Sequence, residues 1–301
     1  MGVEQMIVVS LQGGLGNQLF QYATGRALSV AWGRELVLDL KWFDDVREKR
    51  GVTAREYSLA PFVLPASIQR VGRPGAGGGR IARLLAHFQG PFIPGFQRQF
   101  RLVREPSFQY SPDVFGTPGA VWLDGYWQSW RYFTAIEQQL RAELSTPRSM
   151  NHASLAMLDR IRCCSMAVCL HVRRGDYISN PSAANFHGTC DLDYYLGALP
   201  NLSRIGNPTC FIFSDDVDWV RDNLRLPCET VVVDINGPAD AHQDLWLMAN
   251  CRHFIIANSS LSWWGAWLGG SSDKQVFAPR NWFREDRRDT SDLIPPNWRR
   301  I

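Results

Sequence analysis

The chain has 301 residues, of which 45% are hydrophobic and 20% are charged, and its formal net charge at pH 7 is +3. A chain of this length is expected to form two domains of about 150 residues each, and its composition is ordinary for a soluble globular protein. The small net charge gives no support for a nucleic-acid partner.

Seven cysteines are present, without a Cys-x-x-Cys pair and without the Cys/His spacing of a zinc site. Several lie in apolar runs, so we interpret them as buried thiols in a reducing compartment. The apolar stretch at residues 4–11 is too short to span a bilayer, and no signal peptide is visible. These features predict a cytoplasmic protein.

The first half begins with a strand, a glycine turn and a helix. Residues 6–11 are apolar, Gly13-Gly14-Leu15-Gly16 forms a tight turn, and residues 17–32 have helical spacing. Gly14-x-Gly16 matches part of the dinucleotide fingerprint, and Asp39 lies where that motif has its ribose-binding acid. Because the third glycine is missing, a dinucleotide site is kept only as an alternative.

A second strand is predicted at 35–40, and residues 44–118 then show no regular pattern, with a loop at 75–79. Arginines gather in this region, either as a solvated face or as a peripheral contact with anionic lipid that would suit a lipid-linked acceptor. They are Arg70, Arg73, Arg80, Arg83, Arg98, Arg101 and Arg104.

A strand at 121–124 leads into Gly125-Tyr126-Trp127-Gln128-Ser129, and residues 131–144 have a helical pattern. Residues 147–151 are predicted to be a linker, which places the first domain at 1–150. The second half alternates helix and strand, which predicts a parallel, doubly wound sheet. The helices are expected at 152–162, 193–199, 217–224, 241–250 and 260–268, and the strands at 165–172, 210–214, 230–234, 254–257 and 275–278.

Two arginines stand at the end of the apolar strand 165–172, in His171-Val172-Arg173-Arg174-Gly175-Asp176-Tyr177. Ligands of open parallel sheets bind beyond the carboxyl ends of the strands. An arginine fork at that place suits a phosphate or a carboxylate. The alternative is a surface pair of arginines with a structural ion pair to Asp176.

A second strand end offers a similar chemistry. Residues 254–257 run into Asn258-Ser259-Ser260, directly before a predicted helix. Asparagine and serine favour the N-cap position, and a helix N-terminus binds anions through its free amides. Ordinary capping is the competing explanation for the serines.

At this point five stretches together resemble the bacterial α-1,2-fucosyltransferase family. They are Gly13 to Ala23, Gly125 to Ser129, His171 to Tyr177, Phe213-Ser214-Asp215-Asp216 and Asn258 to Leu268, and they occur in order through both halves of the chain. The resemblance implies an α/β fold of the GT-B type, with two Rossmann-like doubly wound domains facing across a cleft. It implies an acceptor-side domain at 1–150, a GDP-fucose domain at 151–278, and a tail at 279–301 that packs toward the first domain.

The implied enzyme is an inverting galactoside α-1,2-fucosyltransferase. It would transfer L-fucose from GDP-fucose to the 2-hydroxyl of a terminal β-galactoside, in bacteria on a lipopolysaccharide O-antigen glycan. A related transferase with another nucleotide-sugar donor and a non-catalytic glycan- or nucleotide-binding protein on the same fold are the alternatives. No cofactor or metal is expected, because Asp215 and Asp216 are adjacent and do not form the Asp-x-Asp of metal-dependent transferases.

The resemblance also implies roles for individual residues. Arg173, Arg174, Ser259 and Ser260, with Asn258 beside them, would handle the charge of the diphosphate. Asp215 or Asp216 would either accept a hydrogen bond from guanine or ribose, or cap the next helix. Asn17 would lie near the reaction centre, or would cap the first helix, or both. His171 is expected either to anchor the strand end or to act in catalysis.

The catalytic base is not fixed by the sequence. Some relatives carry a glutamate ten residues after the histidine of this motif, where this chain has Pro181. Asp176, His187 and Asp191 are the candidates, with Asp176 ranked first. A late proton transfer without a strong base is the alternative.

Overall fold

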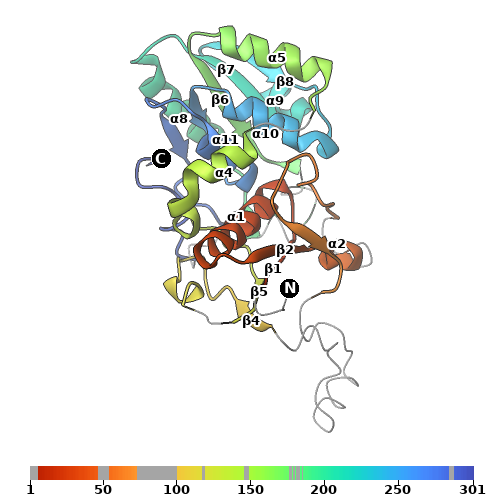
Figure 1. Cartoon of the computed structure of the whole chain (residues 1–301). Helices are drawn as coiled ribbons and strands as arrows, with labels where there is room; N and C mark the ends of the chain where they lie inside the picture. The colour runs from red at the N-terminus through yellow and green to blue at the C-terminus, as the bar shows by residue number, and fades with distance from the viewer. Residues whose placement is uncertain are drawn as a thin grey trace. The chain divides into compact units, whose positions relative to one another are not determined.

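The computed structural model describes residues 6–46, 54–72, 100–116, 119–145, 149–175, 178, 180, 184, 186–284 and 288–301 (Figure 1). The chain forms two compact units, Met1–Tyr57 with Leu64–Leu140, and Ser58–Val63 with Arg141–Ile301. The sequence placed the division near residue 150, whereas these units divide within helix α4, Glu137–Leu144. Arg141 explains part of this difference, because it stacks over Trp267 at 4.5 Å and donates to the carbonyl of Leu268 at 3.0 Å.

The first unit is built on a parallel sheet of five strands in the order β3-β2-β1-β5-β4. The predicted strand, glycine turn and helix at its start are confirmed. The strands are β1 Met6–Ser10, β2 Glu35–Asp39, β3 Ser67–Gln69, β4 Arg101–Arg104 and β5 Val121–Asp124. The helical elements are α1 Leu15–Trp32, α2 Lys41–Val46, η3 Pro112–Val114, η4 Trp130–Ile136 and the first half of α4.

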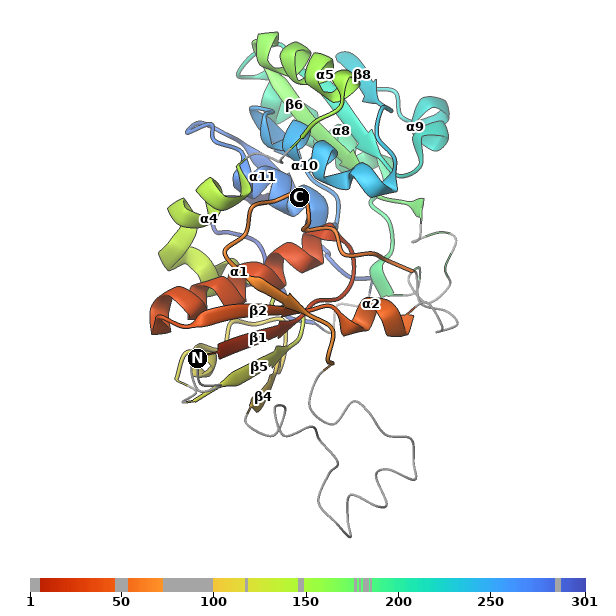
Figure 2. The ribbon, with the colours of Figure 1, turned by 45° about the vertical axis from the view of Figure 1, so that its right-hand side comes forward.

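Helix α1 runs along one face of this sheet, beside β1 and β2 (Figure 2). Its central glycine permits the contact, since a Cβ atom on Gly25 would lie 2.4 Å from the side chain of Val9. The helix ends at Gly33, whose left-handed conformation (φ 62°) suits a glycine cap. The glycine turn is therefore fixed between a buried strand and a buried helix, at the carboxyl edge of the sheet.

The second unit contains six parallel strands in the order β11-β10-β9-β6-β7-β8. The predicted alternation of helix and strand is confirmed. The strands are β6 Ala167–Val172, β7 Thr209–Ser214, β8 Glu229–Val233, β9 His253–Ile255, β10 Val276–Ala278 and β11 Arg299–Arg300. The helices are the second half of α4, α5 His152–Cys163, α8 Leu192–Ser203, α9 Val217–Asn223, η5 Pro238–Asp240, α10 Ala241–Ala249 and α11 Ser260–Leu268.

The C-terminal tail, which was predicted to pack toward the first domain, contributes a strand to the second unit. Its last residues form β11, which extends the second sheet beside β10. Trp298 packs on Trp263 with ring centroids 5.4 Å apart, and the indole N–H of Trp263 donates to the carbonyl of Leu293 at 2.8 Å. The apolar face of α11 and the open edge of β10 explain why the tail belongs to the second unit.

All seven cysteines are free thiols, of which Cys169, Cys210 and Cys251 are buried and Cys163 is exposed. The described helices include none that is both long and apolar enough to cross a membrane. Of the arginines in the basic stretch, Arg70 pairs with Asp44 and Arg104 lies 3.7 Å from Asp124. These ion pairs favour a solvated face; Arg73, Arg80, Arg83 and Arg98 lie outside the described residues.

Candidate functional site

The second sheet reverses its direction of growth between β6 and β9. From β6 the chain adds β7 and then β8 on one side, and it returns to add β9 on the other side of β6. The loops that follow β6 and β9 therefore leave neighbouring strands in opposite directions. Such a switch point is where open α/β sheets bind their ligands, and both motifs that the sequence predicted to bind an anion lie at it.

Arg173 directly follows β6 and is held by Asp215, which directly follows β7. Its guanidinium lies 3.0 Å from the carboxylate of Asp215, and only 18% of its side chain is exposed. Burial opposes the charged form of Asp215, but Arg173 and the backbone amides of Arg174 and Gly175 outweigh it and lower the pKa of this carboxyl. A Cβ atom on Gly175 would lie 2.6 Å from the same carboxylate, so a larger residue at this position would displace Asp215 from its place beside Arg173.

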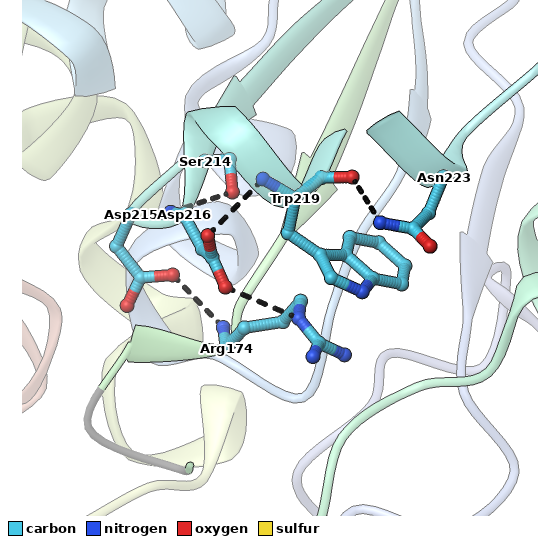
Figure 3. A network of polar contacts seen from close by, with 6 residues as sticks. All are labelled: Arg174, Ser214, Asp215, Asp216, Trp219 and Asn223. Atoms are coloured by element: carbon cyan, nitrogen blue, oxygen red, sulfur yellow. Dashed lines mark hydrogen bonds and ion pairs between the residues drawn. The ribbon is translucent and has the colours of Figure 1, made fainter. Parts of the chain in front are cut away.

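Arg174 is fixed by three contacts (Figure 3). Its backbone amide donates to Asp215 at 2.8 Å, and its Nε lies 3.3 Å from the carboxylate of Asp216. Its guanidinium also lies 3.9 Å from the ring centroid of Trp219, a cation–π contact. The described partners of the fork are therefore Asp215 and Asp216, whereas Asp176, the predicted partner and first-ranked base, lies outside the described residues.

Asp216 caps helix α9, which is one of the two roles predicted for the acidic pair. Its carboxylate accepts from the amide of Trp219 at 3.3 Å, and its own amide donates to the hydroxyl of Ser214 at 3.0 Å. Asp215 does not cap this helix, because its carboxylate faces Arg173 and the backbone of Arg174. The two neighbouring carboxylates thus orient the two arginines separately.

His171 joins β6 to α11. Its Nδ1 lies 2.9 Å from the hydroxyl of Ser262, which donates to the carbonyl of Ser259 at 3.3 Å. Burial, together with the nearby charge of Arg173, lowers the pKa of His171 to about 4 against the opposing effect of Asp215. The imidazole is therefore neutral at pH 7 and fixes the first turn of α11, in agreement with the anchoring role predicted for it.

The three polar residues before α11 have different tasks. The Asn258 amide, 3% exposed, donates to the carbonyls of His187, Gly188 and Trp282 at 3.1 to 3.2 Å. Ser259 is the N-cap residue, but its side chain makes no capping hydrogen bond with the described first turn of the helix. Ser260 begins the helix. Asn258 thus holds the loop, and the amides of the first turn are not occupied by the Ser259 hydroxyl.

The opposite end of α11 is neutralised by cations. Lys274 donates to the carbonyls of Ala266 and Gly269 at 2.8 and 2.7 Å, and Arg141 donates to that of Leu268. Cations at a helix C-terminus stabilise its dipole. The helix is therefore fixed with its positive end at the switch point of the sheet.

Asn17 lies in the first turn of α1 and not at its N-cap, which is Gly14. Its Oδ1 accepts from the Nε2 of Gln128 at 2.8 Å. Gly13 has φ 77°, and a Cβ atom on it would lie 2.6 Å from the Nδ2 of Asn17. The capping alternative is therefore wrong, and the glycine turn provides the space that the Asn17 amide occupies.

The two motifs of the first unit that carry the family resemblance are bonded to each other. Gln21 accepts from the amide of Gln12 at 3.0 Å and donates to the carbonyl of Gly125 at 3.0 Å. Sequence reasoning missed Gln21 and Gln128 as functional residues, although both stand inside the quoted motifs. The sequence showed both glutamines next to glycine-containing turns. Their hydrogen bonds, from Gln21 to Gly125 and from Gln128 to Asn17, join residues far apart in the sequence and are visible only in the fold.

Asp39 does not fit a dinucleotide site. It is 2% exposed, and its Oδ1 accepts from the amides of Val71 and Gly72 at 2.8 and 3.1 Å. Burial raises the pKa of this carboxyl, and these amides oppose the rise. The buried Asp39 carboxylate therefore holds the loop at residues 71–72 and is not available to bind a ribose.

The other base candidates have structural partners. The ring of His187 lies among Phe186 and Phe283, with centroids 4.6 and 5.7 Å away. Asp191 caps α8 by accepting from the amide of Tyr194 at 2.8 Å. Among the described residues, no group of three or more His, Cys, Asp or Glu side chains has the arrangement of a metal site.

Comparison with known proteins agrees with this architecture. The family model described as Glycosyl transferase family 11 matches residues 97–301. The chain belongs to glycosyltransferase family 11. It is 35% identical to an alpha-1,2-colitosyltransferase of Escherichia coli, over 98% of this chain and 99% of that protein. It is 30% identical to the O-antigen biosynthesis glycosyltransferase WbnK of Escherichia coli, over 96% and 98% of the two chains.

Among solved structures, a mutant of Arabidopsis thaliana FUT1 in complex with GDP is similar in fold. The two share 10% sequence identity with a TM-score of 0.52, over 97% of this chain and 74% of the plant chain. The family 11 member is thus a glycosyltransferase whose two parallel α/β sheets have the GT-B fold, as the sequence predicted.

The buried, neutral His171 gives a prediction about acid stability. Its folded pKa of about 4 lies below the ordinary 6.5, so the unfolded chain binds more protons between these values. Stability is therefore lost as the pH falls from 6.5 towards 4, by about 3 kcal/mol from this group, since one pKa unit corresponds to about 1.4 kcal/mol. Urea unfolding at several pH values should show a shallower acid loss for His171→Gln than for the wild type.

The exposed His152 on α5 supplies the matched control, because His152→Gln should keep the full acid loss of the wild type. If His171→Gln retained that loss as well, the acid sensitivity would come from other groups, and the neutral anchor would be contradicted.

Proposed function

We propose that this glycosyltransferase transfers L-fucose from GDP-fucose to the 2-hydroxyl of a terminal β-galactoside, with inversion and without a metal. The observation that carries the proposal is that Arg173 and the N-terminus of α11 follow the neighbouring strands β6 and β9, at the switch point of the second sheet. Both supply positive charge to an anion, and neither requires a metal ion. A nucleoside diphosphate leaving group fits this chemistry.

Each residue of the site has a separate role in the proposed reaction. Arg173 and the first amides of α11 stabilise the charge that grows on the β-phosphate as its bond to the sugar breaks. Neutral His171 keeps the helix end in place, and Arg174 with Asp216 shapes the neighbouring loop. Asp215, beside the fork, is the candidate acceptor for a hydrogen bond from the nucleoside. Asn17 is the candidate contact of the first unit at the reacting sugar.

In the transfer, the acceptor hydroxyl oxygen bonds to the anomeric carbon, and GDP leaves with the electron pair of the broken bond. The hydroxyl proton passes to Asp176 or, late in the reaction, to solvent or the departing phosphate. A dissociative transition state needs little help from a strong base. Stabilisation of the leaving group is then the largest contribution of the protein.

Colitosyl transfer is the second candidate, favoured by the name of the Escherichia coli relative that is 35% identical. Colitose is fucose without the 3-hydroxyl, so the two donors make the same demands on the diphosphate site. The name of WbnK, an O-antigen biosynthesis enzyme, supports an oligosaccharide acceptor, which in this setting would be lipid-linked and near a membrane surface.

The proposal is tested by turnover with GDP-fucose and GDP-colitose against terminal β-galactosides, with the product linkage assigned by NMR. We expect an α-1,2-linked fucoside from GDP-fucose, and no product from UDP-galactose under the same conditions. Turnover with GDP-colitose and not with GDP-fucose would show that colitose, not fucose, is the transferred sugar. Turnover with neither GDP sugar would contradict the proposal.

Metal independence has its own test. Because charge on the diphosphate is met by Arg173 and a helix N-terminus, activity should be unchanged within about twofold when EDTA is added to extensively dialysed enzyme. If chelation abolished turnover and Mn²⁺ or Mg²⁺ restored it, a metal ion would take part in the reaction. Arg173 and the helix N-terminus would then not be enough to stabilise the leaving diphosphate.

Replacement of Arg173 tests the leaving-group contact. Lysine keeps the charge but not the planar fork that binds two oxygens at once. Loss of a desolvated charge contact costs on the order of 2–5 kcal/mol, so kcat of Arg173→Ala should fall by about thirty-fold or more, with Arg173→Lys recovering only part. An interaction that strengthens toward the transition state changes kcat and not only affinity.

The competing explanation is a purely structural ion pair with Asp215. It predicts a lower melting temperature for both variants and a normal kcat per folded molecule. The exposed pair of Arg252 and Asp273, 2.5 Å apart on the same unit, is the matched control, since Arg252→Lys should leave kcat unchanged.

A further inference from the structure

At the carboxyl edge of the first sheet, the partly buried carboxylate of Glu105 holds the loop that follows β5. Glu105 comes directly after β4, and its amide donates to the carbonyl of Asp124 at 3.0 Å. Its carboxylate accepts from the amide of Tyr126 at 2.7 Å, and the amides of Trp127 and Gln128 also bond to it. Three successive amides around one anion form a nest of the kind that backbone builds for anions.

The loop is shaped to make this contact. A Cβ atom on Gly125 would lie 2.4 Å from the Cβ of Glu105, so only glycine permits the approach. Trp127 has φ 58°, and it is the one described residue other than glycine with a positive φ. Such a conformation is unfavourable in a bulky residue and persists where its surroundings impose it. Here the surroundings include the Glu105 carboxylate.

The loop is strained further by its own tryptophan. The Trp127 side chain is fully buried, and its indole N–H makes no hydrogen bond within the described structure. An unsatisfied buried donor is unfavourable, so packing of the ring alone would not select this loop conformation. The three hydrogen bonds from backbone amides to Glu105 stabilise the loop conformation against this cost.

The held loop leads directly to Asn17. Gln128, the last residue of the nest, is 8% exposed and donates to the Oδ1 of Asn17 at 2.8 Å. The same loop receives a second bond from α1, because Gln21 donates to the carbonyl of Gly125. The position of the Asn17 amide therefore depends on Gln128, and the position of Gln128 depends on Glu105.

We infer that Glu105 is a positioning residue for transfer, acting through the 126–128 loop and Gln128 to fix the amide of Asn17. This inference rests on the proposed function, in which Asn17 contacts the reacting sugar. Burial raises the pKa of Glu105 while the three amides oppose the rise.

A double-mutant cycle tests the inference, because residues that act through one another have non-additive effects. In the full chain, Glu105→Gln presents an amide donor to the nest and should lower kcat at least about tenfold. In an Asn17→Ala background, the same change should lower kcat less than about twofold. The Kd for GDP, measured by calorimetry, should be the same in all four proteins, since the proposed diphosphate site belongs to the second unit.

Asp39→Asn is the matched control. Asp39 is also a carboxylate at the carboxyl edge of the first sheet that accepts from loop amides, but its amides are those of Val71 and Gly72. Its effect on kcat should be small and should be the same with and without Asn17. The melting temperatures of Glu105→Gln and Asp39→Asn show whether a fall in kcat comes from a less stable fold or from displacement of the Asn17 amide in a folded protein.

Equal effects of Glu105→Gln in both backgrounds, or a change in melting temperature without a change in kcat, would overturn the inference. The cycle is run with whichever donor the wild type turns over, so a wrong donor contradicts the proposed function without affecting this test. Hydrogen exchange of residues 11–21 gives a readout without any donor: it should rise in Glu105→Gln and not in Asp39→Asn, and unchanged exchange would also overturn the inference.

Discussion

The contact between His171 and Ser262 joins the end of the central strand β6 to the first turn of α11. It is a bond between two buried side chains, and burial lowers the pKa of His171 so that the imidazole is neutral at pH 7. Without it, the arginine fork and the helix N-terminus would belong to two separate loops. With it, their positive charges have a fixed spacing, which is what a diphosphate leaving group requires.

Both sheets use polar side chains at their carboxyl edges to fix loops. In the second unit Asp215 holds Arg173, and Asn258 binds three carbonyls. In the first unit Glu105 and Asp39 bind backbone amides. Buried polar groups are tolerated when their hydrogen bonds are satisfied, and a satisfied network allows little movement. The edges of the two sheets are therefore ordered by hydrogen bonds, while apolar packing of strands and helices sets the frame.

Much of this frame was predictable, because apolar periodicity is a local property of the sequence. The strands ending at Ser10 and Val172 and the helix after Ser259 follow directly from it. The short strands β3 and β4 were not predicted, since both are edge strands of the sheet and carry exposed polar residues such as Arg101 and Arg104. The 131–144 helix proved to be partly 3-10, over Trp130–Ile136, where Tyr132 and Phe133 are buried.

The candidate site, like the fold, was predictable only where the signal is local in the sequence. The fork at Arg173 and the helix start at Ser259 could be predicted, because each follows an apolar strand in the chain. Their partners could not be predicted, because Asp215 follows β7 and Gln128 follows β5, both far in the sequence from Arg173 and Asn17. Only the strand order brings each pair together. Glu105 gave no signal at all, since it stands in a stretch without periodicity and its function depends on amides rather than side chains.

Amide hydrogen exchange with and without GDP tests the central claim most directly, that a nucleoside diphosphate binds between the ends of β6 and β9. The account predicts that GDP slows exchange in the peptides covering residues 171–175 and 258–262, while the peptide covering 11–21 in the first unit is unchanged. Protection confined to the glycine turn at residues 11–21, with none at Arg173 or α11, would contradict it.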